Sequence, residues 1–203
     1  MGERMRVILL FIMLLSVYDT QAKVTILFLG DSLTEGYGVA RENAYPKIIE
    51  RRLKADKVKS LKILNGSISG STSASALKRL RFFIKAKPDI LILALGANDG
   101  LRGVKTDTTY KNLKKVIELA KENKIKVLLC GVRVPPNYGK DFEKEFVGIY
   151  TRLQKEFNLA FVPRILEGVA GVPELNQADG IHPNEKGHEI LAQTVYEKLK
   201  ELL

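Results

Sequence analysis

The sequence predicts one α/β domain in three layers, with a five-stranded parallel sheet between two layers of helices. Five short apolar runs alternate with segments whose apolar residues recur at helical spacing. The runs are apolar at consecutive positions, which is typical of strands buried on both faces of a parallel sheet. Strands that alternate with helices join by right-handed crossovers into an α/β/α domain. The length of 203 residues fits one such domain.

The expected strands are the five apolar runs Val24–Leu29, Leu61–Leu64, Ile90–Leu95, Val127–Val132 and Leu159–Val162. Five helices are expected from apolar stripes with three- or four-residue spacing, which start at Tyr45, Leu77, Leu113, Phe142 and Leu191. The only cysteine, Cys130, falls inside the fourth run and is expected to be a buried small hydrophobe. One cysteine excludes an internal disulfide and a multi-cysteine zinc site.

The N-terminal segment has the pattern of a signal peptide. Two arginines among the first six residues precede an apolar run of eleven residues, Val7–Val17, and small-residue cleavage is plausible at Ala22. Eleven residues are too few to span a bilayer. The alternative is an uncleaved anchor, which Lys23 and the polar residues before it interrupt. We therefore expect residues 1–22 to be a signal peptide, residues 23–203 to be the domain, and the protein to be periplasmic or secreted.

The charge is strongly positive, with 33 basic and 23 acidic residues and a formal net charge of +10. Such a balance can indicate nucleic acid, a membrane surface or an anionic substrate. The excess lies in three segments that include predicted helices: Arg41–Lys62, Lys78–Lys87 and Lys105–Lys126. No basic stretch has the interleaved aromatic residues that stack on bases. We expect no nucleic-acid partner, at most peripheral contact with anionic lipid, and a monomer.

Candidate catalytic residues lie in the loops after the predicted strands, where parallel α/β folds place their sites. Ser32 follows the first strand at the expected start of a helix, where N–H groups favour negative charge; the alternative is a helix N-cap. His182 lies in a loop three residues after Asp179, which can orient its imidazole; the alternative is a pair of turn and capping residues. The other histidine, His188, falls in the last helix and is expected to be structural.

Two further loops offer hydrogen-bond donors for an oxyanion. Gly70 can present a backbone N–H, and Asn98 can present a side-chain amide from a loop. Taken singly, they could be a turn glycine and a capping or Asx-turn residue. All the loops belong to one expected sheet edge, and together they supply a nucleophile, a base and the donors. No phosphate-loop, complete dinucleotide-binding or H-E-x-x-H motif is present, so no cofactor and no metal are expected.

These loops resemble the four sequence blocks of the SGNH, or GDSL, hydrolase family. The blocks occur in the family's order and span essentially the whole chain after the signal: Gly30-Asp31-Ser32-Leu33, Gly66 to Gly70, Gly96-Ala97-Asn98-Asp99, and Asp179-Gly180-Ile181-His182-Pro183. The chain is most similar to the periplasmic branch of thioesterases, lysophospholipases and arylesterases. The resemblance implies a flavodoxin-like fold and hydrolysis of carboxylic esters and thioesters of acyl substrates, which could include lysophospholipids.

The resemblance also implies roles for individual residues. Ser32 would be the nucleophile, His182 the base and Asp179 the residue that orients the base. The N–H groups of Ser32 and Gly70 and the amide of Asn98 would form the oxyanion hole. The substrate-binding residues would come from two loops that resemble the family's active-site and acyl-pocket loops: Leu101, Arg102, Pro135, Asn137 and Tyr138.

Asp31 belongs to the family signature, but a structural role is expected for it. The branch usually has an aspartate after the glycine of the second block, where this chain has Ser71. Two alternative functions remain open. One is deacetylation of a sugar or cell-envelope polymer, and the other is a basic module that binds anionic surfaces without catalysis.

Overall fold

The computed structural model describes residues 24–58 and 60–203. Five parallel strands form one sheet in the order β2-β1-β3-β4-β5, which is the flavodoxin-like order. The strands match the five expected runs to within two residues: β1 Thr25–Gly30, β2 Lys62–Asn65, β3 Ile90–Ala94, β4 Lys126–Cys130 and β5 Ala160–Val162. The predicted fold class is therefore confirmed.

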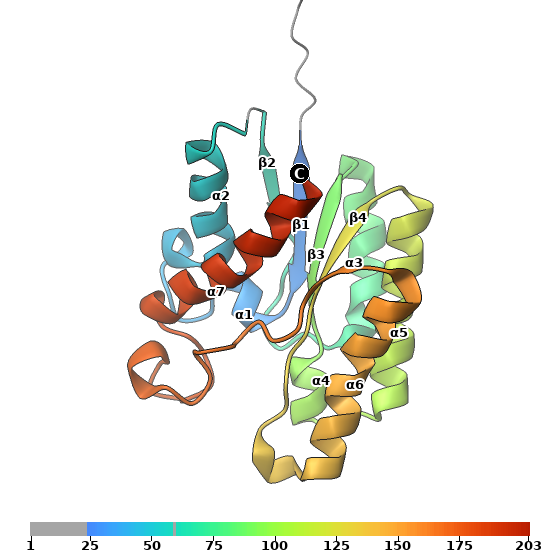
Figure 1. The fold of residues 1–203 in the computed structure, drawn as a ribbon, viewed down its shortest axis with the longest axis vertical. Helices are drawn as coiled ribbons and strands as arrows, with labels where there is room; N and C mark the ends of the chain where they lie inside the picture. Colours follow the sequence, from blue (N-terminus) through green and yellow to red (C-terminus); the bar gives the residue numbers. More distant parts are fainter. Residues whose placement is uncertain (1–23, 59) are drawn as a thin grey trace, which may run out of the picture.

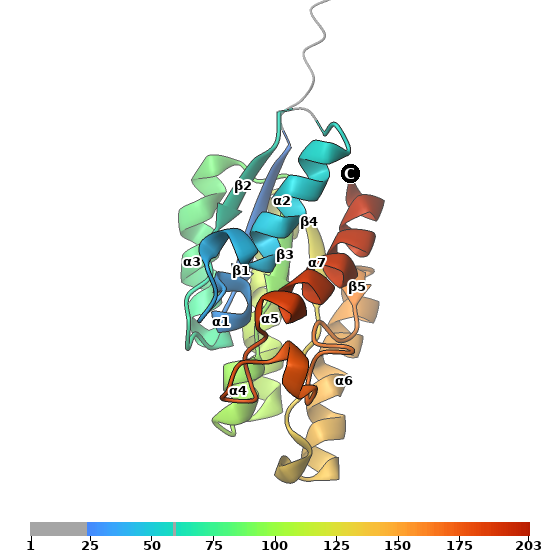
Figure 2. The same ribbon diagram turned by 90° about the vertical axis from the view of Figure 1, so that its left-hand side faces the viewer.

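Each predicted apolar stripe lies on a helix. The five long helices are α2 Tyr45–Ala55, α3 Ala76–Phe83, α5 Thr106–Glu122, α6 Lys140–Phe157 and α7 Glu185–Leu199. Helices α2 and α7 pack together on one face of the sheet, and α3, α5 and α6 pack on the other (Figure 1). Figure 2 shows α2 and α7 lying across the near face of the strands. The helical stripes and the strands thus share one core on each side of the sheet.

The central strands are buried on both faces, as continuous apolar runs require. Every residue of β1 and β3 is buried, and Cys130 at the end of β4 is buried as expected. Burial raises the pKa of the Cys130 thiol to about 12, because the thiolate would lose its hydration. Cys130 is therefore a packing residue and not a reactive thiol.

Two short helices, α1 Ser32–Glu35 and α4 Ala97–Leu101, follow β1 and β3 directly. From β1 the chain passes to β2, on one side of β1 in the sheet, whereas from β3 it passes to β4, on the opposite side. The order of connections therefore reverses between the neighbouring strands β1 and β3. Crevices at such a reversal are where ligands bind in open parallel sheets. The topology therefore favours a site beside α1 and α4.

The segment predicted to be a signal peptide, residues 1–22, lies outside the described residues. Among the residues that the structure describes, no helix is long and apolar enough to cross a membrane.

Candidate active site

Ser32 is the first residue of α1 and stands directly beyond the end of β1. The helix is capped by Asp31, whose Oδ1 accepts the Leu33 N–H at 3.1 Å. The capping alternative for Ser32 is therefore wrong, and the structural role expected for Asp31 is confirmed. Since the cap is supplied by its neighbour, the Ser32 hydroxyl is left to interact across the loop.

His182 lies between Ser32 and Asp179. Its Nε2 atom is 2.9 Å from Ser32 Oγ, and its Nδ1 atom is 2.6 Å from Asp179 Oδ2. The other carboxylate oxygen, Asp179 Oδ1, accepts the backbone N–H groups of His182 and Ile181 at 3.0 and 2.9 Å. The backbone N–H of His182, followed by its side chain, lowers the pKa of Asp179 to about 2. An ionised carboxylate at Nδ1 favours the tautomer in which Nε2 can accept a proton from Ser32.

The loop that carries His182 is fixed on both sides by hydrogen bonds. Gln177 N–H donates to His182 O at 2.7 Å, and Gln177 Nε2 donates to Tyr37 O at 2.7 Å. The Tyr37 ring packs against the imidazole with 4.8 Å between ring centroids. On the other side, Asn184 caps α7 by accepting the Gly187 N–H. These contacts hold His182 against the turn that follows Ser32.

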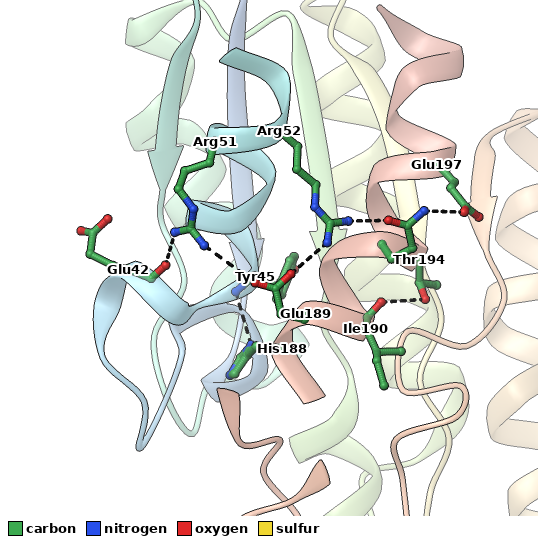
Figure 3. A network of polar contacts seen from close by, with 10 residues as sticks. Glu42, Tyr45, Arg51, Arg52, His188, Glu189, Ile190, Thr194 and Glu197 are labelled. Carbon is green, nitrogen blue, oxygen red and sulfur yellow. Dashed lines mark hydrogen bonds and ion pairs between the residues drawn. The ribbon is translucent and has the colours of Figure 1, made fainter. Parts of the chain in front are cut away.

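Helix α7, which begins just after His182, is tied to α2 by a polar network (Figure 3). Arg52 donates to Glu189 at 2.9 Å and to Gln193 at 2.6 Å. Deeper in the interface, His188 Nδ1 accepts the Tyr45 N–H at 3.3 Å, at the start of α2. Burial lowers the pKa of His188 to about 4, so it is neutral at pH 7. The structural role predicted for His188 is confirmed.

Two of the three expected oxyanion donors, Gly70 and Asn98, come from segments that a hydrogen bond joins. Gly70 has a φ of +74°, which L side chains rarely adopt, so the turn requires glycine here. Asn98 lies in the first turn of α4, so its predicted position in a loop is wrong. Its Nδ2 donates to Ser71 O at 3.1 Å. An amide has two N–H bonds, so the second remains for a ligand.

The residues expected to bind substrate come together only in part. Tyr138, in the 3-10 helix Pro136–Tyr138, donates its hydroxyl to Leu101 O at 2.9 Å, which joins the two expected loops. Arg102 donates through Nη2 to Gly70 O at 2.9 Å. Pro135 and Asn137 are exposed, and among the described residues no side-chain hydrogen bond links Asn137 to the Ser32–His182 pair.

Sequence reasoning missed three residues that hold the site together. Gln177 fixes the His182 loop, as described above. Arg79, on α3, donates through Nη1 to the carbonyls of Gly30 and Gly66 and so joins the ends of β1 and β2. Asp99 is buried beside Asn98 and binds the segment that follows Gly70. Each of the three has at least one hydrogen-bond partner 26 or more positions away in the chain. No local sequence pattern signals such a contact.

A linked serine, histidine and aspartate at the carboxyl edge of a parallel α/β/α sheet is an arrangement found in serine hydrolases. The order of the three residues along the chain, serine first and histidine last, is not decisive, since such triads are recognised by geometry. In the described part of the chain, no group of three or more His, Cys, Asp or Glu side chains could hold a metal ion.

Comparisons with known proteins agree with this class. Residues 28–190 match the model of the GDSL-like Lipase/Acylhydrolase family. The chain is 38% identical to Esterase TesA of Pseudomonas aeruginosa over 98% of this chain and all of that protein. It is 35% identical to thioesterase 1/protease 1/lysophospholipase L1 of Escherichia coli K12, covering 96% of this chain and 91% of that one. The chain therefore belongs to the GDSL-like lipase and acylhydrolase family, also called SGNH hydrolases.

Solved structures show the same fold. The crystal structure of TesA superposes with a TM-score of 0.84 at 38% identity, covering 88% of this chain and 99% of that one. The psychrotrophic esterase EstA from Pseudoalteromonas sp. has a TM-score of 0.82 at 31% identity, covering 87% of this chain and 97% of that one. This chain is accordingly a GDSL-type ester hydrolase with the SGNH fold.

Proposed function

We propose that the chain hydrolyses small acyl esters and thioesters through an acyl-enzyme formed on Ser32. The observation that carries the proposal is the position of His182, with Ser32 Oγ 2.9 Å from one ring nitrogen and Asp179 2.6 Å from the other. A weak nucleophile becomes reactive when a base lies within hydrogen-bond distance and a third group orients that base. Among the described residues, this cluster provides all three groups.

The first step is attack by Ser32 on the carbonyl carbon of the substrate. His182 Nε2 takes the hydroxyl proton as the bond to carbon forms, and Asp179 stabilises the resulting imidazolium. Collapse of the tetrahedral intermediate breaks the bond to the leaving alcohol or thiol, which takes the proton from His182. A water molecule then loses a proton to His182 and attacks the acyl carbon. Collapse of the second tetrahedral intermediate breaks the bond to Ser32 Oγ, which takes the proton back from His182 as the acid leaves.

The oxyanion of each tetrahedral intermediate would be bound by the N–H groups of Ser32 and Gly70 and by the Asn98 amide. Among the described residues, neither of the two backbone N–H groups donates to a protein acceptor. Asn98 keeps one N–H free while the other holds Ser71 O. Donors that are fixed before reaction stabilise the charge without reorganisation, and removing one typically costs about 10²–10³ in rate.

The exposed apolar side chains support an acyl substrate. The large hydrophobic residues with the highest exposure in the described chain include five on segments around the catalytic residues: Tyr37, Ile68, Leu101, Tyr138 and Ile181. Exposed apolar surface that gathers around one site is typical of a surface that binds apolar ligands. We propose that Leu101 and Tyr138 contact the acyl chain, with Arg102, Pro135 and Asn137 beside them.

The compartment is part of the proposal. We propose that residues 1–22 direct export, which places the enzyme in the periplasm or outside the cell. Fractionation of expressing cells, with and without residues 1–22, tests this: the full chain should appear outside the cytoplasm and the shortened chain inside it.

The test of the function is a chain-length series of p-nitrophenyl esters, run beside an acyl thioester, a lysophospholipid and an acetylated saccharide. Ser32→Ala provides the blank. The proposal predicts Ser32-dependent hydrolysis of acyl esters and at least one thioester. Activity on the acetylated saccharide alone would favour the deacetylase, and full activity in Ser32→Ala would reject the mechanism.

A further inference from the structure

Asp99 is a buried carboxylate at the back of the proposed oxyanion hole. Only 1% of the surface of Asp99 is exposed to solvent. Oδ2 accepts the Ser73 N–H at 2.8 Å, and Oδ1 accepts the Ser73 hydroxyl at 2.5 Å and the Thr109 hydroxyl at 3.1 Å. A carboxylate removed from water needs such donors, and charge-assisted hydrogen bonds of this kind are shorter and stronger than neutral ones.

These bonds connect the two segments that carry the proposed oxyanion donors. Asp99 is the next residue after Asn98, and Ser73 is three residues after Gly70. A second link joins the same segments, because Asn98 Nδ2 donates to Ser71 O. The segment of Gly70 and the start of α4 are thus cross-linked twice, once through Asn98 and once through Asp99.

The scaffold fixes this cross-link from a third element. Thr109 and Asn112 are one turn apart on α5, the long helix that packs against α3 and α6. Thr109 donates to Asp99, and Asn112 Nδ2 donates to the Ser73 hydroxyl at 3.0 Å. The position of Asp99 is therefore set by a rigid helix and not by the loops alone.

We propose that Asp99 is a positioning residue that sets the distance between the Gly70 N–H and the Asn98 amide. The inference rests on the function proposed above and adds a residue that does not touch substrate. An oxyanion hole requires donors about 2.7–3.1 Å from the developing charge, so a displacement of a few tenths of an ångström weakens it. Such a displacement acts on the transition state and leaves substrate binding nearly unchanged.

In the cluster as it stands, both carboxylate oxygens of Asp99 act as acceptors. Asp99 receives three donors, whereas asparagine at this position offers one carbonyl oxygen and an NH₂ group. With its oxygen in the place of Oδ2, the amide can still accept the Ser73 N–H, but its NH₂ then faces the Ser73 and Thr109 hydroxyls, which must rotate to accept from it. The Ser73 hydroxyl, which already accepts from Asn112, then loses Asp99 as the acceptor of its own proton. Asp99→Asn therefore preserves side-chain size while it disturbs the cross-link.

The test compares Asp99→Asn with Asp89→Asn. Asp89 also accepts a backbone N–H, that of Thr25 at 2.7 Å. It lies just before β3, at the amino ends of the strands and so at the opposite end of the sheet from the site. We expect Asp99→Asn to lower kcat on p-nitrophenyl butyrate by about 10–100-fold with KM changed less than threefold. Asp89→Asn should leave kcat within a factor of two of the wild type. The thermal unfolding midpoints of both variants are measured to check that each is folded.

A second readout reports the oxyanion hole without turnover. An alkylboronic acid forms a bond from boron to Ser32 Oγ while the hydroxyl proton passes to His182. The tetrahedral boronate anion that results places one of its hydroxyl oxygens where the oxyanion would lie. Its inhibition constant should rise in Asp99→Asn by about the same factor as kcat falls, while KM stays constant. If Asp99→Asn does not fold, Thr109→Val, which removes one donor with little change in shape, should lower kcat at least threefold.

The proposal is overturned if folded Asp99→Asn keeps kcat and boronate affinity within a factor of two of the wild type. It is equally overturned if Asp89→Asn loses kcat in the same proportion, or if Thr109→Val leaves kcat unchanged when it serves as the substitute. Failure of the proposed function has a different signature, since Ser32→Ala would then retain the activity of the wild type.

Discussion

The Nε2 atom of His182 lies 2.9 Å from the hydroxyl oxygen of Ser32, although 150 positions separate the two residues in the chain. The fold brings them together because Ser32 begins α1, just after β1, and His182 lies in the loop before the last long helix, α7. Helix α7 is held on α2 by Arg52 and Glu189. The contact on which the proposed chemistry depends is therefore a product of the whole fold.

Replacing Asp179 by asparagine should lower kcat by about 10³–10⁴ while the loop keeps its shape. The asparagine Oδ1 can still accept the N–H groups of Ile181 and His182, but its NH₂ would face Nδ1 and favour the wrong tautomer of the imidazole. Steady-state kinetics on p-nitrophenyl butyrate measures the loss. A variant with more than a tenth of wild-type kcat would show that Asp179 does not orient His182.

The pKa of about 2 for Asp179 adds a pH dependence to this prediction. A lowered carboxyl pKa means that the interaction is present above about pH 4 and is lost only as the pH falls toward 2. The wild-type profile of kcat/KM between pH 4 and 9 should therefore contain no limb from Asp179.

Asn98→Ala should lower kcat by about 10²–10³ with little change in KM, because the amide would act on the oxyanion and not on the bound ester. Asn123→Ala is the matched control. Asn123 is exposed at the end of α5, and its Nδ2 donates to Leu119 O, so the same atoms are removed away from the site. Equal losses in the two variants would contradict the proposed role of Asn98.

How far the sequence could predict this site depends on which residues are considered. The strands and the positions of Ser32, Asp179 and His182 follow from local patterns: apolar runs, the residue after a strand, and a spacing of three. The placement of Asn98 was wrong because the five residues of α4 are too few to show helical periodicity.

Asp99, Arg79 and Gln177 could not be found in this way, since each acts through a contact with a different part of the chain. A polar residue next to a motif residue has the same sequence pattern whether its side chain is exposed or buried. Only the packing of α5 and α3 against the loops decides that Asp99 and Arg79 are turned inward.

Leu101→Ser should narrow the range of acyl chains. Leu101 is partly exposed beside Tyr138, and a side chain of this size that an acyl chain covers contributes about 1–2 kcal/mol. We expect kcat/KM for p-nitrophenyl octanoate to fall about tenfold relative to the acetate. Phe82→Ser is the control, because Phe82 lies on α3 and is 70% exposed. It should leave that ratio unchanged. Loss of acetate and octanoate activity in equal proportion would argue against an acyl-contact role.

His188→Asn should make the protein less sensitive to mild acid. The pKa of His188 is lowered to about 4 from an ordinary 6.5, so the unfolded chain binds more protons than the folded one between these values. Stability that is present above pH 6.5 is lost as the pH falls toward 4. Asparagine can accept the Tyr45 N–H through Oδ1 and has no proton to gain.

Urea unfolding at pH 7.5 and pH 5 measures the effect. The wild type should lose about 2 kcal/mol more unfolding free energy between these pH values than His188→Asn does. An identical pH dependence in the two proteins would mean that folding does not lower the pKa of His188.

The central claim is that Ser32 is the nucleophile, activated by His182, and covalent labelling tests it most directly. The protein is treated with a fluorophosphonate, which phosphonylates an activated serine and loses fluoride, and intact mass and peptide mapping locate the adduct. We predict one adduct per chain, on Ser32, with activity lost in the same proportion, and labelling slowed at least a hundredfold in His182→Ala. An adduct on another residue, or full activity in a chain labelled at Ser32, would contradict it.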